Sequence, residues 1–139
     1  MLQERIEGKW LAAFRRVFAL NGIGRGTQIA IISETQSRPV LVHLCELAAY
    51  DLGADFCMIQ MPTPPQVAPV PVKSTGTSWA IRQNLDVIEA LKRVDVVVDC
   101  TVEGLIHAPE WPEIEDAGRA RLLVITNEHP EILERTEPK

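Results

Sequence analysis

The segment QIAIIS at residues 28–33 is a short and nearly continuous apolar run. Such a run is typical of a strand that is covered on both faces, as strands of a parallel sheet are. Three further segments, 55–61, 95–100 and 121–126, have the same short and apolar character. Four buried strands are therefore predicted at these positions.

Segments with helical periodicity lie between and before these strands. Residues 2–20 repeat apolar side chains, including Trp10 and Phe14, at helical spacing. A second helix is expected from Ser37, as the capping residue, to about Leu52. A third is expected to begin at the cap Ser78 and to place four apolar residues on one face. These four are Ile81, Leu85, Ile88 and Leu91. A weak acidic helix is expected at residues 114–117.

The alternation of strands and helices decides the fold class. Short apolar strands joined by helical connections form right-handed βαβ units and a parallel sheet. We therefore expect an α/β fold, a three-layer αβα sandwich with a four-stranded parallel sheet, of Rossmann-like or flavodoxin-like type. The expected strand order is 2-1-3-4, and residues 1–139 are expected to form a single domain.

Two loops are rich in residues that interrupt regular structure. The glycine-rich stretch 21–26 follows a helix and leads into a strand, whereas a phosphate-binding loop has the opposite order. It is interpreted as a helix stop and connector. The proline-rich stretch 62–71 is expected to be an extended loop over the sheet edge, or else a ligand for a proline-binding module.

Composition excludes several classes of protein. The net charge of −5 argues against nucleic-acid binding, and neither a membrane-spanning segment nor a secretory signal is recognisable. The three cysteines, Cys45, Cys57 and Cys100, fit neither a disulfide framework nor a zinc ribbon. They are expected to be buried free thiols, which agrees with a cytoplasmic location.

Candidate site residues lie where the predicted strands end. Glu34, Asp99 and Glu128 would meet at the carboxyl edge of the sheet, where ligands of open α/β sheets bind. Together they could hold a magnesium ion, or Glu34 and Glu128 could simply be stabilised by nearby helix N-termini. His107 lies in a loop and is a further weak candidate. No motif for a nucleophile, a metal ligand set or a cofactor is recognisable, so no catalytic, cofactor-binding or metal residue is assigned.

Two segments resemble a known family. One is residues 37–55, and the other is residues 89–138, which contain VDVVVD, His107, Pro109-Glu110, Gly118-Arg119, Pro130-Glu131 and Leu133. They resemble the N-terminal domain of the group that contains 2,5-dihydroxypyridine 5,6-dioxygenase. This non-haem iron enzyme is related in fold to the thermophilic aminopeptidase T-like leucyl aminopeptidases.

The resemblance implies a scaffold domain of a larger metalloenzyme. Its iron(II), or another divalent metal, would be bound by a C-terminal domain that is absent from this chain, so this chain would carry no cofactor and would not be active alone. The expected activity of the whole enzyme is ring cleavage of dihydroxypyridine-type compounds. The alternatives are an aminopeptidase-like hydrolase and a stand-alone assembly module. The expected partners are the C-terminal domain or a second copy, as in a homo-oligomer.

Overall fold

The chain forms one parallel β-sheet. The structure is a computed structural model that describes residues 7–64 and 77–125. Its strands are β1 (Gln28–Glu34), β2 (Asp55–Met61), β3 (Val96–Cys100) and β4 (Arg121–Val124). They are ordered β2-β1-β3-β4, and each neighbouring pair is parallel. The predicted strand positions, direction and order are confirmed, although β4 ends at Val124 and is shorter than predicted.

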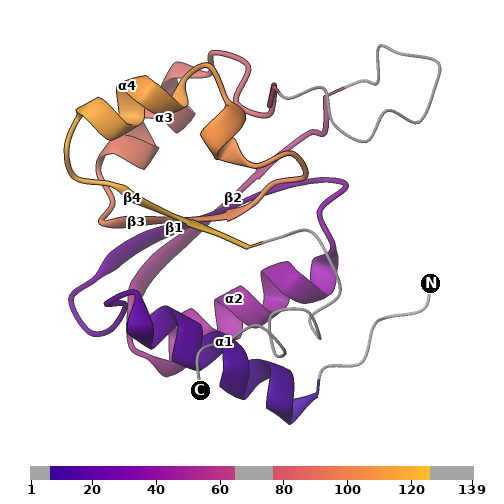
Figure 1. The fold of residues 1–139 in the computed structure, drawn as a ribbon, viewed down its shortest axis with the longest axis vertical. Helices are drawn as coiled ribbons and strands as arrows, with labels where there is room; N and C mark the ends of the chain where they lie inside the picture. Colours follow the sequence, from indigo (N-terminus) through magenta and orange to yellow (C-terminus); the bar gives the residue numbers. More distant parts are fainter. Residues whose placement is uncertain (1–6, 65–76, 126–139) are drawn as a thin grey trace.

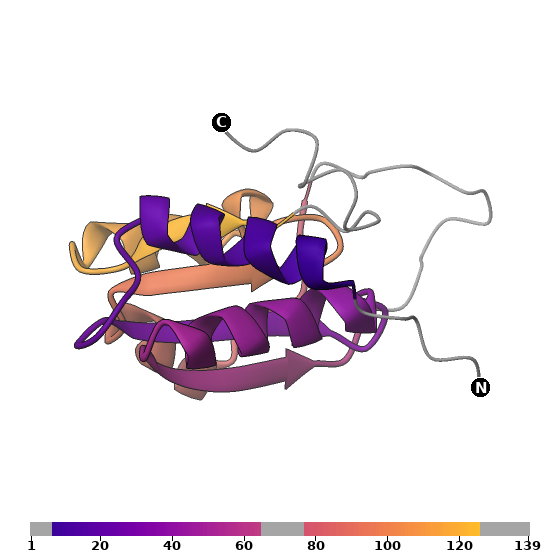
Figure 2. The same cartoon turned by 90° about the horizontal axis from the view of Figure 1, so that it is seen from below.

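Helices cover both faces of this sheet (Figure 1). On one face lie α1 (Gly8–Leu20) and α2 (Pro39–Asp51), and on the other lie α3 (Leu85–Lys92) and α4 (Trp111–Asp116). Figure 2 shows α1 and α2 side by side across their face. Alternate residues of β1 pack into the two resulting cores: Ile29 and Ile31 face α1 and α2, and Ala30 and Ile32 face α3 and α4. The predicted three-layer αβα sandwich is confirmed.

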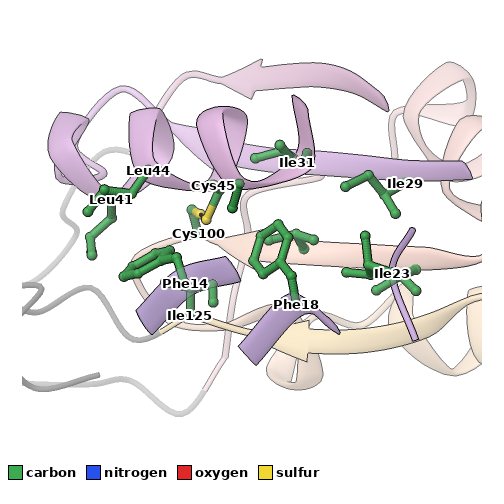
Figure 3. Packing of buried hydrophobic residues seen from close by; sticks show 14 of the residues in the cluster. Phe14, Phe18, Ile23, Ile29, Ile31, Leu41, Leu44, Cys45, Cys100 and Ile125 are labelled. Atoms are coloured by element: carbon green, nitrogen blue, oxygen red, sulfur yellow. Dashed lines mark hydrogen bonds between the residues drawn. The ribbon is translucent and has the colours of Figure 1, made fainter. Parts of the chain in front are cut away.

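The aromatic residues of α1 belong to the core. Phe14 and Phe18 are fully buried, and Trp10 is nearly so. They pack against α2 residues such as Leu44 and against the sheet (Figure 3). The apolar stripe of α1 is therefore covered within the chain itself. The predicted start of this helix, residues 2–6, lies outside the described residues, and the helix in the structure begins at Gly8.

The loop after α1 is a connector, as expected. Gly22 adopts a φ of +76°, and the backbone N–H of Ile23 donates to the Phe18 carbonyl oxygen at 3.1 Å. This left-handed residue after the last turn is a common way to end a helix, and glycine adopts it without steric cost. The chain then enters β1, so this loop is not a phosphate-binding loop.

Neither predicted serine caps a helix. Ser37 is buried, and its hydroxyl donates to the Cys100 carbonyl oxygen at 2.5 Å and accepts from the Glu34 N–H at 2.8 Å. The residue before α2 is Arg38, which makes no side-chain cap. Ser37 lies where β1 and β3 end, so backbone groups of those strands compete for its hydroxyl.

The third helix begins later than predicted. Asn84 caps α3, because its Oδ1 accepts from the N–H groups of Asp86 and Val87 at 3.1 and 3.2 Å. Ser78 lies well before this helix, and its backbone N–H donates to the His107 carbonyl oxygen. Ile81 is buried but precedes the helix, and Leu85 is 73% exposed. The predicted apolar face is therefore wrong at both of these positions.

The three cysteines differ in burial, contrary to the prediction that all three are buried. Cys45 and Cys100 are buried with their sulfur atoms 3.7 Å apart, but Cys57 is exposed on the edge strand β2. It was predicted to be buried, and it is exposed because an edge strand is less covered than a central one.

Most of the proline-rich stretch and the helical turn expected after β4 lie outside the described residues. No helix in the described ranges is long and apolar enough to cross a bilayer.

Candidate functional site

The topology singles out the carboxyl edge between β1 and β3. From β1 the chain moves outward to β2, and it then crosses back over β1 to reach β3. The strand order thus reverses direction between β1 and β3, and ligands of open α/β sheets bind outside such a point. Glu34 ends β1, and Asp99 lies near the end of β3. The structure therefore brings these two predicted candidates to the same edge.

Asp99 binds the protein's own backbone. It is fully buried, and its Oδ1 accepts from the Thr101 N–H at 2.9 Å and from the Thr101 hydroxyl at 2.5 Å. Its Oδ2 accepts from the Leu105 N–H at 2.6 Å. A carboxylate that receives several N–H and O–H groups holds them in a fixed geometry. Asp99 thereby fixes the segment that follows β3.

Glu34 secures the same segment from β1. Its Oε2 accepts from the Val102 N–H at 2.5 Å, and its own N–H donates to Ser37. Ser37 in turn binds the carbonyl of Cys100. The ends of β1 and β3 are thus joined through residues 100–105. The structural interpretation of Glu34 is supported, but the donors are loop N–H groups and not the helix N-terminus that was expected.

Burial raises the pKa of both carboxyl groups. Loss of solvent raises the pKa of Glu34, although the Val102 N–H partly opposes this effect. Loss of solvent likewise raises the pKa of Asp99, against the hydrogen bonds from Thr101 and Leu105. The negative charge of Asp99 also raises the pKa of Glu34. Each carboxylate therefore makes folding less favourable when ionised than when protonated.

The variant Glu34→Gln is expected to change the pH dependence of stability. Because the folded-state pKa of Glu34 is raised, the folded state holds its proton more tightly, and that contribution to stability is full below the unfolded pKa of about 4.3. It is lost as pH rises through the folded-state pKa. Wild type should therefore gain stability relative to Glu34→Gln as pH falls from 7 toward 4. Urea unfolding of both proteins across this range measures the difference. A difference independent of pH would contradict the argument.

Of the three candidates that the structure describes, Glu34, Asp99 and His107, only His107 is exposed. It ends a 3₁₀ turn, η1 (Leu105–His107), and is exposed. Its backbone is held on two sides, since its N–H donates to the Gly104 oxygen and its oxygen accepts from the Ser78 N–H, at 3.1 and 3.0 Å. Gly104 has a φ of +90°, and a Cβ there would lie 3.9 Å from both Asp99 Oδ2 and His107 Cδ2. The turn that carries His107 is therefore built on the buried Asp99.

Exposed apolar side chains lie along the same segments. Trp79 is 55% exposed and Ile106 is 60% exposed. The hydrogen bond between the backbones of Ser78 and His107 brings these two segments together. The edge thus exposes an imidazole and large apolar side chains. The carboxylates of Glu34 and Asp99 instead accept hydrogen bonds from backbone N–H groups.

Sequence reasoning missed one feature of this edge. Arg82 and Gln83 both have positive φ, +53° and +60°. Side chains in this region cost about 1 kcal/mol per residue relative to ordinary backbone. The buried Glu110 contacts this turn through Gln83, with its Oε2 3.3 Å from the Gln83 N–H nitrogen. A sequence signal for such a turn would be asparagine or glycine, and neither occupies these positions.

The described residues do not fit a metal site. Within residues 7–64 and 77–125, no three His, Cys, Asp or Glu side chains lie close enough together to hold a metal ion. The chemistry of Glu34 and Asp99 agrees, since oxygens of both carboxylates bind N–H groups. The predicted third carboxylate, Glu128, lies outside the described residues.

Comparison with known proteins gives two matches. Residues 9–139 match the family model described as NicX: 2,5-dihydroxypyridine 5,6-dioxygenase. The fold is similar to the solved structure of 2,5-dihydroxypyridine dioxygenase from Pseudomonas putida KT2440, with a TM-score of 0.80 and 26% sequence identity. The match covers 94% of this chain and 37% of that chain. Among curated proteins, none matches significantly.

Proposed function

The chain belongs to the 2,5-dihydroxypyridine 5,6-dioxygenase family, and from this premise we propose that it is the N-terminal scaffold domain of a ring-cleaving dioxygenase. The observation that carries the proposal is the extent of the structural match. Nearly the whole chain superposes on a dioxygenase chain of which it spans 37%. The remainder of such an enzyme would supply the second domain. A cytoplasmic location is part of the proposal, because the cysteines are free thiols.

Iron(II) is proposed to be bound by that second domain. The metal would supply the activation of dioxygen. The described residues offer no ligand set for it, and the best-placed carboxylates, Glu34 and Asp99, hold backbone N–H groups. No step that involves the metal is therefore assigned to this chain.

The role proposed for this chain is to form one wall of the substrate channel. The wall is the carboxyl edge with His107, Trp79 and Ile106. An exposed imidazole can exchange hydrogen bonds and protons with a bound ligand, and an exposed indole offers a flat apolar surface for an aromatic ring. The bonds that Asp99 and Glu34 make to residues 101–105 keep the turn with His107 in place.

Ring cleavage tests this proposal. The 139-residue chain, purified and incubated with iron(II), should retain no stoichiometric metal after dialysis and should not consume 2,5-dihydroxypyridine. The same chain joined to, or mixed with, the second domain of a dioxygenase of this family should consume the ring compound with uptake of oxygen. Loss of the ring's ultraviolet absorbance and an oxygen electrode measure both. Ring cleavage by the chain alone would contradict the scaffold role, and peptide hydrolysis by the joined protein would favour the aminopeptidase-like alternative.

A matched pair of histidine variants controls the experiment. His107→Ala in the active protein should lower kcat/KM for the ring compound by about a hundredfold or more, since proton transfer by a positioned side chain typically contributes about a hundredfold to ten-thousandfold. His43 is exposed on α2, on the opposite side of the sheet. His43→Ala should leave kcat/KM unchanged. Equal effects of the two variants on kcat/KM would contradict the proposal that His107 forms part of the channel wall.

A further inference from the structure

The turn before α3 has an unusual backbone for its sequence. The Asn84 N–H donates to the Ile81 carbonyl oxygen at 3.0 Å, which closes a four-residue turn. Its two central residues, Arg82 and Gln83, both have positive φ. This pattern is that of a type I′ turn, which strongly favours asparagine and glycine at both central positions. Arginine and glutamine disfavour this backbone conformation, so contacts with neighbouring residues must stabilise the turn.

The surroundings hold the turn at three points. Ile81 before it is fully buried in the core of the α3 and α4 face. Asn84 after it caps α3 through two hydrogen bonds. Glu110, which is buried, accepts from the Gln83 N–H and, at 3.5 Å, from the Gln83 amide nitrogen. The strained conformation therefore persists, and strain of this kind concentrates at ligand-binding positions.

The turn places Arg82 at the candidate edge. Arg82 is exposed, and its Nη2 lies 3.5 Å from the carbonyl oxygen of Pro62, directly after β2. Burial raises the pKa of Glu34, and the positive charge of Arg82 weakly opposes that rise, as expected for a guanidinium near the junction between β1 and β3. Among the ion pairs of the described residues, none involves Arg82. The guanidinium thus keeps donor groups available for a further partner.

We propose that Arg82 binds an anionic oxygen of the ligand at this edge. A guanidinium is always charged and presents paired N–H donors that suit a carboxylate or another oxyanion. Because the turn fixes its backbone on both sides, less freedom is lost when it binds.

This inference rests on the proposed function for the nature of the ligand. Cleavage between ring atoms 5 and 6 breaks one carbon–carbon bond, and each carbon gains one oxygen atom of dioxygen. The carbon that carried the hydroxyl becomes a carboxylate. Arg82 would therefore bind an oxyanion in either case. The oxyanion is the ionised ring hydroxyl before cleavage or the carboxylate after it.

Binding measured without turnover tests the inference. The protein is titrated with 2,5-dihydroxypyridine under argon and, separately, with maleamate, a small carboxylate that mimics a ring-opened product. Isothermal titration calorimetry gives both Kd values. Arg82→Gln should raise the Kd for one or both probes by about tenfold to a hundredfold, as expected for loss of a charge-assisted hydrogen bond. The probe that is affected identifies the source of the oxyanion. Unchanged Kd values for both probes, or no binding of either to wild type, would overturn the inference.

Two glycine variants separate binding from a structural role. Gln83→Gly relieves one left-handed residue but also removes the amide nitrogen that lies 3.5 Å from Glu110, so Tm should change by no more than a few degrees, with affinity unchanged because the guanidinium is kept. Arg82→Gly relieves the other left-handed residue without loss of that contact, so it should raise Tm by a few degrees but lose affinity. A lower Tm with unchanged affinity for Arg82→Gly would show that the residue serves only the fold.

The inference and the proposed function can fail separately. If Arg82→Gln loses probe binding but no form of the protein cleaves the ring, the dioxygenase proposal fails and the anion-binding role stands. If ring cleavage occurs with unchanged kcat/KM in Arg82→Gln, and probe binding is also unchanged, the role of Arg82 fails and the dioxygenase proposal stands.

Discussion

Replacement of Asp99 by alanine is expected to lower the free energy of unfolding by about 3 kcal/mol. The change leaves the N–H groups of Thr101 and Leu105 without their acceptor in a buried place. Each such group costs about 1–3 kcal/mol, and removal of the costly burial of the carboxylate offsets part of the sum. Urea denaturation followed by circular dichroism measures the loss.

The variant Thr101→Val is the matched control for Asp99→Ala. It removes the hydroxyl that donates to Asp99 Oδ1 but keeps both N–H donors. Its expected cost is about 1 kcal/mol, the usual contribution of a single hydrogen bond. Equal losses in the two variants would show that the hydroxyl, and not the backbone of residues 101–105, is what Asp99 holds. Hydrogen exchange at the Leu105 amide should be faster in Asp99→Ala than in the control.

Replacement of Trp10 by alanine is expected to cost about 3–5 kcal/mol. Trp10 is 5% exposed and belongs to the core between α1, α2 and the sheet. Removal of an indole from such a place loses apolar burial and leaves a cavity. Urea denaturation measures the effect, and Leu20→Ala is its control. Leu20 ends the same helix but is 66% exposed, so its replacement should change stability by less than about 0.5 kcal/mol.

The oligomeric state distinguishes this core role from an interface role. Within residues 7–64 and 77–125 the edge strands β2 and β4 each pair with only one neighbour, and an open edge can template association. Self-association of the protein therefore stays a prediction, to be measured by light scattering across a concentration series. Trp10→Ala should destabilise the fold without changing the fraction of oligomer. A dimer that dissociates in this variant with its stability intact would contradict the burial argument.

The fold could be predicted because its signals are local and repeated. Each strand is a short run of β-branched and apolar residues, and each connection is long enough for a helix. Together these dictate parallel pairing. The segment 28–33 at the centre of the sheet is apolar on both faces because helices cover both faces. The position of Glu34 and Asp99 at one edge followed from the same pattern, since the carboxyl ends of parallel strands meet.

The use made of these polar residues was decided by tertiary structure alone. A serine before a helical segment predicts a cap, yet Ser37 binds the carbonyl of Cys100, which is 63 residues away in sequence. Asn84 rather than Ser78 caps α3, and contacts from Glu110 help to hold the turn before it in a conformation that its own residues disfavour. Local sequence determines periodicity and therefore which face is buried. Hydrogen-bond partners that are distant in the chain become neighbours only after the sheet has formed, and they then outweigh local preference.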